Sequence, residues 1–234
     1  MKGTKYLISF LVVVALVLGI QTSSHAIATL SLSDGITTVI VADGGVGDLN
    51  VAADAVTFSG TVGAWLINVS TGLTNSALGG TPAAAHMDLN SVNVLSSGAS
   101  TLTIRFSEID YTGLLSGGIF SSILQAGGTL TAPAGSSVGF SAFLDPGNGL
   151  FVQTSPIGTI GPFGPGAFSG TGGGSAATGT PFSLTLDGIL TFAGPGSASF
   201  NYELQSVPEP ISLILLGSGL AGVGLYRRLR KPRG

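Results

Sequence analysis

The residues best placed to bind a metal lie in the segment Asp43–Asn50, which reads Asp-Gly-Gly-Val-Gly-Asp-Leu-Asn. Asp43 and Asp48 would offer carboxylate oxygens, and the glycines between them would let backbone carbonyls turn towards the same point. Oxygen ligands of this kind suit a hard cation such as Ca²⁺. A solvated turn is the simpler interpretation because the pattern occurs once, so we predict no cofactor, with calcium as the alternative.

Catalysis would have to depend on Glu108 and Asp110, or on Ser137. The two acids would share one face of a strand, where a carboxylate pair could act on a glycosidic bond. Ser137 lies in a Gly-x-Ser-x-Gly pattern, but a serine hydrolase needs a helix after this turn and a later histidine. Here the following segment alternates like a strand, and His86, an isolated histidine in an apparent loop, comes earlier. Cysteine is absent. We therefore predict no catalytic residue and no enzyme.

Alternation of apolar and polar residues with a period of two predicts that these groups are carried by an all-β fold. Many short strands separated by Gly, Asn, Asp and Pro are typical of an antiparallel β-sandwich or jelly roll. A parallel β-helix is the competing architecture, but it requires a fixed repeat that the chain lacks. The clearest strands are 101–107, 138–144, 182–186 and 200–204; weaker ones are 28–33, 36–42, 56–62, 65–70, 89–95, 128–132 and 150–154.

Two segments depart from this alternation. Residues 114–125 could form a short helix, although Gly117 and Gly118 weaken it. Residues 156–180 are rich in glycine, a composition typical of flexible chain. We predict a long Gly-rich loop there, within a single β-sandwich domain that spans residues 27–206.

The N-terminus has the organisation of a signal peptide over residues 1–26. Lys2 and Lys5 precede an apolar stretch, Tyr6–Ile20, which is followed by a short polar segment ending at Ala26. Because the apolar stretch is shorter than the roughly 20 residues that span a bilayer, cleavage after Ala26 is favoured over an uncleaved anchor. We expect export through the Sec machinery.

The charge of the predicted domain differs from that of the whole chain. The chain has a formal net charge of −3, but between residues 27 and 206 Arg105 is the one cation among ten acidic residues. A surface of that sign repels phosphates and anionic headgroups. We predict that the domain binds neither nucleic acid nor anionic lipid.

The C-terminal segment, residues 207–234, has three parts in a fixed order. Its motif consists of Val207, Pro208, Glu209 and Pro210, and the prolines keep that segment extended. An apolar run over 211–226 predicts a transmembrane helix, and the basic tail 227–234 would stay on the cytoplasmic side. The basic stop-transfer residues are Arg227, Arg228, Arg230, Lys231 and Arg233.

This tail resembles the PEP-CTERM sorting signal of exported proteins in Gram-negative bacteria. The resemblance covers the motif, the glycine-interrupted apolar run and the terminal arginines, and a signal peptide stands at the other end. It implies recognition of Pro208, Glu209 and Pro210 by an exosortase, a membrane cysteine transpeptidase. It also implies an inner-membrane anchor before processing, and then release to the cell surface or to a biofilm matrix that contains exopolysaccharide.

The function that follows is that of an exported structural protein of the cell surface or extracellular matrix, with exopolysaccharide as the expected partner. The alternative is a carbohydrate- or ice-binding β-sandwich module delivered by the same signal. These two functions differ in whether the domain has a ligand of its own.

Processing of the tail is directly testable. The protein isolated from mature envelope should have an intact mass that lacks the residues beyond the Pro208–Pro210 region, because the sorting signal is removed. Deleting the exosortase should restore the missing mass. Recovery of chains that end at Gly234 from wild-type envelope would contradict processing.

Overall fold

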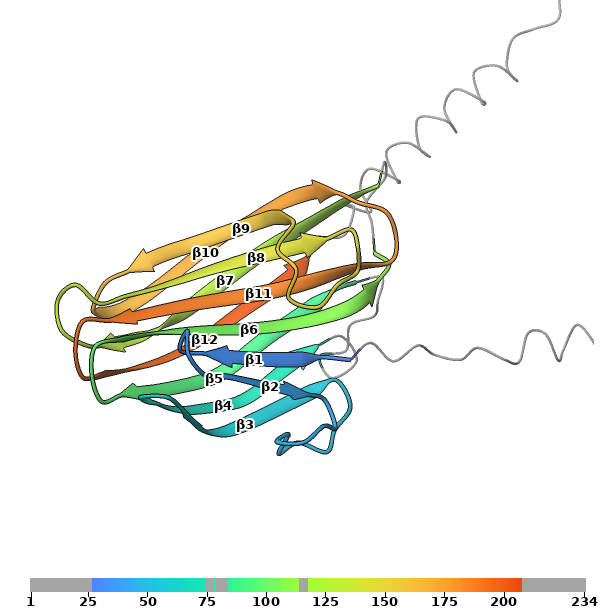
Figure 1. The fold of residues 1–234 in the computed structure, drawn as a ribbon. Helices are drawn as coiled ribbons and strands as arrows, with labels where there is room; N and C mark the ends of the chain where they lie inside the picture. Colours follow the sequence, from blue (N-terminus) through green and yellow to red (C-terminus); the bar gives the residue numbers. More distant parts are fainter. Residues whose placement is uncertain (1–26, 75–77, 79–83, 114–117, 208–234) are drawn as a thin grey trace, which may run out of the picture.

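The computed structural model describes residues 27–74, 78, 84–113 and 118–207, which form two antiparallel β-sheets packed face to face (Figure 1). The predicted antiparallel β-sandwich is confirmed. The strands are β1 (Thr29–Ser33), β2 (Thr38–Ala42), β3 (Ala55–Val62), β4 (Trp65–Thr74), β5 (His86–Ser96), β6 (Ser100–Tyr111), β7 (Ile119–Thr131), β8 (Ser137–Asp145), β9 (Ser155–Phe163), β10 (Gly166–Ala177), β11 (Phe182–Phe192) and β12 (Gly196–Ser206).

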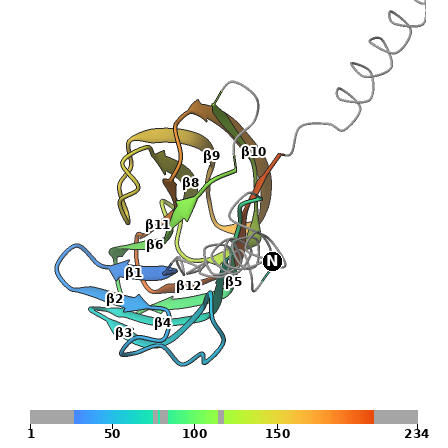
Figure 2. The ribbon, with the colours of Figure 1, turned by 90° about the vertical axis from the view of Figure 1, so that its right-hand side faces the viewer.

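Each sheet has six strands. Sheet A has the order β2-β1-β6-β11-β8-β9, and sheet B has the order β10-β7-β12-β5-β4-β3. Consecutive strands therefore often belong to different sheets, and β9 and β10 form one lateral edge of the sandwich while β2 and β3 form the other (Figure 2). This topology brings the late strand β12 between β7 and β5 in the middle of sheet B.

The core follows from the alternation seen in the sequence. Leu102, Ile104 and Phe106 of β6 are fully buried, as the period of two predicts. Aromatic rings join the two sheets: the ring centroid of Phe140 in sheet A lies 5.1 Å from that of Phe200 and 4.9 Å from that of Tyr202. Buried aromatic pairs of this kind stabilise a fold beyond the apolar area they remove from water.

The predicted loop over residues 156–180 is wrong, because most of this segment forms β9 and β10. The physical reason is the position of the glycines. A Cβ atom on Gly172 would lie 2.9 Å from the carbonyl oxygen of Thr159, and one on Gly174 would lie 3.0 Å from that of Ile157. Glycine at these alternating positions lets the two backbones approach closely, so the composition marks a sandwich edge and not a flexible loop.

Two further expectations need correction. From Ile119 onwards the predicted helix 114–125 is part of β7, where Phe120 and Leu124 are buried while Ile123 and Gln125 point to solvent. Alternating burial over β7 outweighs the weak helix pattern. The predicted strand 150–154 is instead part of the turn before β9.

The predicted signal peptide and the predicted transmembrane helix lie outside the described residues. Among the residues that the structure does describe, no helix is long and apolar enough to cross a membrane.

The close approach of β9 and β10 predicts the effect of adding one methyl group. Gly172→Ala should lower the free energy of unfolding by about 1–3 kcal/mol, because the new Cβ meets the backbone of β9. Gly179→Ala is the matched control, since a Cβ there meets nothing within 4 Å. That variant should stay within about 0.5 kcal/mol of wild type. Urea unfolding of the two variants tests the prediction, and equal stabilities would contradict it.

Candidate functional site

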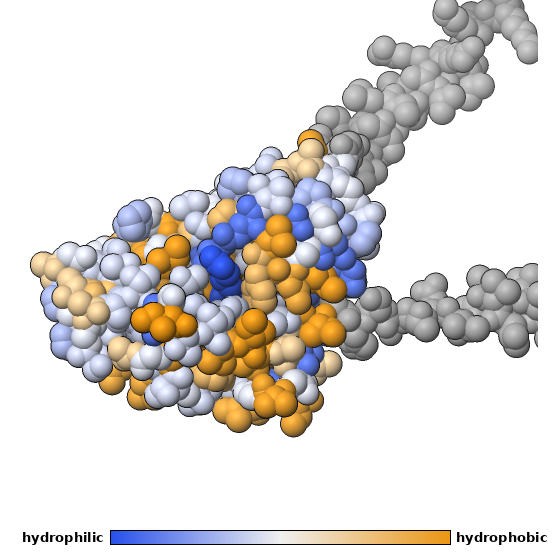
Figure 3. Space-filling view, viewed as in Figure 1, coloured by the Kyte–Doolittle hydropathy of each residue, from blue (hydrophilic) through white to orange (hydrophobic). Residues whose placement is uncertain are grey.

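The outer face of sheet A is partly closed by the chain itself. Residues 146–154, which connect β8 to β9, lie over this face (Figure 1). The backbone N–H of Phe151 donates to Ser107 Oγ (3.1 Å), and the side-chain amide of Gln153 donates to Asp187. Asp187 also pairs with Arg105 at 3.4 Å. Ser107 and Asp187 are consequently buried although they point away from the core, and Figure 3 shows hydrophilic side chains gathered near the middle of this face.

The outer face of sheet B is more open and carries two hollows. The first hollow has a volume of about 670 Å³, and the second has a volume of about 340 Å³. Both lie over β5, β12 and β7, the first extending to β10 and the second to β4. The first is lined by Asp88, Gln125, Ala126, Gly127, Ser169, Gly170, Thr171, Asn201 and Glu203, and the second by Leu66, Asn68, Asn93, Val94, Leu95, Thr129, Thr131, Ser197, Ala198 and Ser199.

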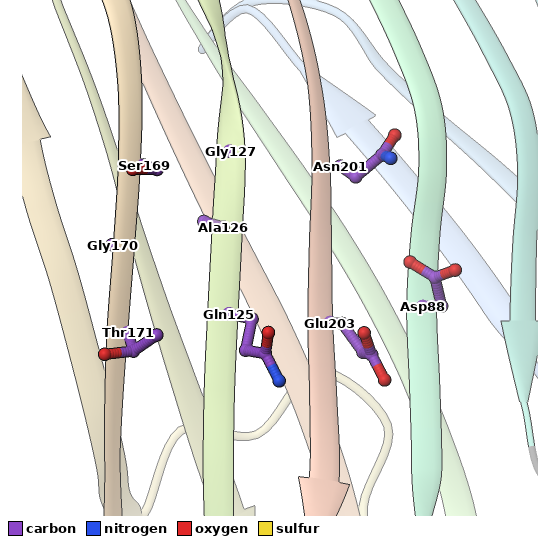
Figure 4. Close-up of a pocket in the computed structure, with 9 residues that line it drawn as sticks. All are labelled: Asp88, Gln125, Ala126, Gly127, Ser169, Gly170, Thr171, Asn201 and Glu203. Atoms are coloured by element: carbon purple, nitrogen blue, oxygen red, sulfur yellow. The ribbon is translucent and has the colours of Figure 1, made fainter.

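Strand register sets the polar groups of the first hollow in a row. Glu203 lies opposite Asp88 on one side and opposite Gln125 on the other, and Gln125 lies opposite Thr171. In Figure 4 the side chains of Asp88, Glu203 and Gln125 stand on the adjacent strands β5, β12 and β7. Since neighbouring strands are about 4.8 Å apart, carboxylate, amide and hydroxyl groups follow one another at that interval.

The two carboxylates of this row interact with each other. Burial, followed by the negative charge of Glu203, raises the pKa of Asp88 from 3.8 to about 6. The charge of His86 and a hydrogen bond from Asn90 Nδ2 (3.4 Å) act in the opposite direction. Glu203 Oε1 lies 2.6 Å from His86 Nε2. His86 is thus part of β5 with an acidic partner, and the prediction of an isolated loop histidine is wrong.

A β-bulge beside the first hollow fixes another of its lining groups. Asn90 and Ser91 together face Asn201, and Ser91 has a φ of 51°, which is uncommon for a residue with a side chain. Asn201 Oδ1 accepts a hydrogen bond from the backbone N–H of Ser91 at 2.7 Å, and Asn93 Nδ2 donates to the carbonyl of Ser91 at 2.9 Å. These bonds hold the strained turn and orient the Asn201 amide at the rim of the hollow.

The two aspartates named as candidate calcium ligands, Asp43 and Asp48, stabilise their own loop. Asp48 accepts backbone hydrogen bonds from Gly44, Asn50 and Thr57, each at 2.9 Å, and Asp43 accepts one from Asp54 N at 2.8 Å. In the described part of the chain, no group of three or more His, Asp or Glu side chains is placed to hold a metal ion. The prediction of no cofactor, with calcium as the alternative, is not tested by this geometry.

The structure separates the candidate catalytic residues. Glu108 is buried and accepts hydrogen bonds from Tyr111 Oη and from Thr74 Oγ1 (3.1 Å). Asp110 instead forms a reciprocal pair with Asn148, with bonds of 2.7 and 2.8 Å. The two acids therefore do not share one face. Ser137 begins β8 and is followed by strand residues, so the helix required by a serine-hydrolase elbow does not follow it.

Sequence reasoning missed the lining of the first hollow and most of the lining of the second. Alternation around Phe200, Tyr202 and Leu204 implies that Asn201 and Glu203 point outwards, which is the one signal the sequence offers. It cannot show that Asp88 and Gln125 flank Glu203, because that depends on strand pairing.

The predicted processing residues lie almost entirely outside the described part of the chain. Ala26, Pro208, Glu209, Pro210 and the basic tail all fall there. Val207 is the last described residue, and its backbone N–H donates to the carbonyl of Ser121 in β7 at 2.9 Å. The sandwich therefore reaches the first residue of the sorting motif.

By its fold, the chain is an all-β sandwich protein with two hollows on the outer face of sheet B. Residues 206–231 match the family model of the PEP-CTERM protein-sorting motif, so the resemblance found in the sequence is confirmed. The chain is thus an exported protein that is anchored in a membrane before an exosortase processes it.

Other comparisons add little to this. No curated protein matches the chain. Solved structures with some similarity include TmCBM61 in complex with beta-1,4-galactotriose (7% identity, 60% of this chain and 86% of that chain, TM-score 0.29). They also include TmCBM27, a carbohydrate-binding module that recognises mannan (13% identity, 67% and 96%, TM-score 0.27). Likenesses with such low TM-scores carry no argument about this chain.

The buried carboxyl group of Glu108 predicts a dependence of stability on pH. Its pKa is raised from 4.5 to about 7, mainly by burial. The folded state therefore binds more protons than the unfolded state between these values, and the free energy of unfolding should fall as pH rises from about 4.5 to 7. The loss attributable to Glu108 is on the order of 3 kcal/mol.

Glu108→Gln keeps the shape of the side chain and removes this titration. We expect the variant and the wild type to have similar stabilities at pH 4.5 and the variant to be more stable at pH 8, measured by urea unfolding. The raised pKa of Asp88 also makes the free energy of unfolding fall as pH rises, but this contribution is the same in the variant and the wild type. Parallel stability curves across this range would contradict the assignment.

Proposed function

We propose that the protein is an exosortase-processed component of the cell surface or extracellular matrix whose sandwich binds polysaccharide along the outer face of sheet B. The observation that carries the proposal is the pair of hollows on that face. Glu203 in the first and Ser197 in the second are six residues apart on β12, a separation of roughly 20 Å. Such a length suits an extended polymer better than a small metabolite.

The lining chemistry supports a sugar ligand. Hydroxyl groups of a sugar donate and accept hydrogen bonds, and the two hollows offer carboxylate acceptors, amides that do both, and hydroxyls. The side chains of Gln125 and Thr171 make no hydrogen bond within the described residues, so their polar groups can meet a ligand. They project from strands, which hold their positions more rigidly than loops do.

Neither hollow is lined by an aromatic side chain among the described residues. Without a ring for a sugar to stack on, each sugar unit contributes modestly, and useful affinity requires contact with several units. Repeated display of the protein in a matrix would raise its apparent affinity further. Weak, multivalent attachment fits a component that holds a matrix together.

The same hollows favour carbohydrate over ice, the other ligand anticipated for this module. An ice surface calls for a flat and regular array of hydroxyls. Thr129 and Thr131 supply a short run of them, but Asp88 and Glu203 place carboxylates on the same face. A purely structural role without any ligand is the competing outcome of the binding test.

A glycan array followed by titration tests the proposal. We expect the exported protein to bind at least one class of extracellular polysaccharide, and Gln125→Ala with Thr171→Ala to weaken that binding roughly tenfold, since each lost hydrogen bond contributes about 0.5–1.5 kcal/mol. The matched control is Thr101→Ala with Thr191→Ala, an exposed pair on sheet A. If no polysaccharide binds, or if both double variants behave alike, polysaccharide binding on sheet B is refuted.

A further inference from the structure

We propose that the ligand is an amino-sugar polymer that carries both free amines and N-acetyl groups. A free amine lies between Asp88 and Glu203 in the first hollow, and an N-acetyl group lies against Leu66 and Leu95 in the second. This inference rests on the proposed binding of polysaccharide to sheet B and names its chemical class.

The acidic pair is the first observation. Asp88 and Glu203 are directly opposite each other in the strand register, and like charges in that position destabilise a sheet. Partial burial, followed by this repulsion, raises the pKa of Asp88. An ammonium group between the two carboxylates would relieve the repulsion and donate a charge-assisted hydrogen bond to each of them, since an ammonium only donates and carboxylates accept.

The charges around this pair exclude the opposite kind of ligand. His86 contacts Glu203 at 2.6 Å and is the one basic side chain that the described residues bring to the pair. Arg105 lies on sheet A, where it pairs with Asp187 at 3.4 Å. A uronate or sulfated polymer would therefore meet two carboxylates without a dedicated cation, which disfavours it.

The surrounding cavity gives the acidic pair a ligand-sized space. The first hollow, of about 670 Å³, has walls that include Gln125, Ser169 and Thr171. These neutral groups match the hydroxyls that flank an amine on a sugar ring. A bare metal ion would leave them unused, so an organic cation with hydroxyl groups accounts for more of the lining.

The second hollow has a different chemistry. Leu66 and Leu95 lie opposite each other and are 53% and 52% exposed, and Asn68 and Asn93 form the next outward pair along the same strands. An acetamido group fits this arrangement, because its methyl can cover the leucines while its amide exchanges hydrogen bonds with the asparagines. Among the described residues, no charged side chain lines this hollow, so a free amine would lose hydration there without gaining a partner.

The test uses glucosamine oligomers of equal length that are fully N-acetylated, partly de-N-acetylated or fully de-N-acetylated, with a neutral glucose oligomer and a uronate oligomer beside them. Titration calorimetry on protein exported from the full-length chain should rank the partly de-N-acetylated oligomer first. The uronate oligomer should bind weakest, and added salt should weaken amine-containing ligands selectively.

Variants assign each group to its hollow. Asp88→Asn should weaken the amine-containing oligomers about five- to tenfold, the range of a partly desolvated charge-assisted contact, and should leave the fully acetylated oligomer unchanged. Leu95→Ser should weaken the binding of the fully acetylated oligomer and leave that of the fully de-N-acetylated oligomer unchanged. Asp34→Asn is the matched control, because it removes one acid near the β2 edge while keeping the side-chain oxygen that accepts from Ile36 and Thr37. Unfolding curves confirm that each variant is folded.

The possible failures are distinguishable. Equal affinity for neutral and amine-containing oligomers, with Asp88→Asn binding like wild type, would overturn the amino-sugar assignment and leave polysaccharide binding standing. Preference for the uronate oligomer would also overturn it. Binding to none of the oligomers, and to no polysaccharide on the array, would overturn both.

Discussion

The close approach of β9 and β10 is the constraint on which the rest of the sandwich depends. These strands end sheets A and B on the same side, and glycine at alternating positions of β10 lets the two backbones meet without intervening side chains. The other face of β10 then points outwards with Ser169 and Thr171, which become one wall of the first hollow. The alternation of residues along β10 thus lets this strand pack against β9 on one face and line the first hollow on the other.

The sequence predicts the fold well wherever burial alternates with apolar side chains. Leu102, Ile104 and Phe106 illustrate this, since each is buried as the period of two requires. Prediction fails over 156–180 because glycine has two opposite uses, flexibility and close packing, that composition alone cannot separate. Only the position of β9 beside β10 distinguishes them.

The candidate site was less predictable than the fold for a different reason. Asp88, Gln125 and Glu203 are far apart in the chain and meet through strand pairing, which no local pattern encodes. The residues that did stand out in the sequence turn out to support the structure: Asp48 holds its own loop through three backbone bonds, and Glu108 is buried beside Tyr111. The carboxylates that stood out in the sequence thus stabilise the fold, whereas Asp88 and Glu203, which did not stand out, line the first hollow.

The hydrogen bond from the backbone N–H of Val207 to the carbonyl of Ser121 affects how an exosortase can reach the sorting motif. The sorting motif begins at Val207, which is still hydrogen-bonded to β7. No linker residue therefore separates the folded sandwich from the motif that the exosortase must bind. An exosortase that acts after folding has to admit the rim of a rigid sandwich close to its active site. Cleavage within the motif would leave a product whose new C-terminus lies close to the end of β12.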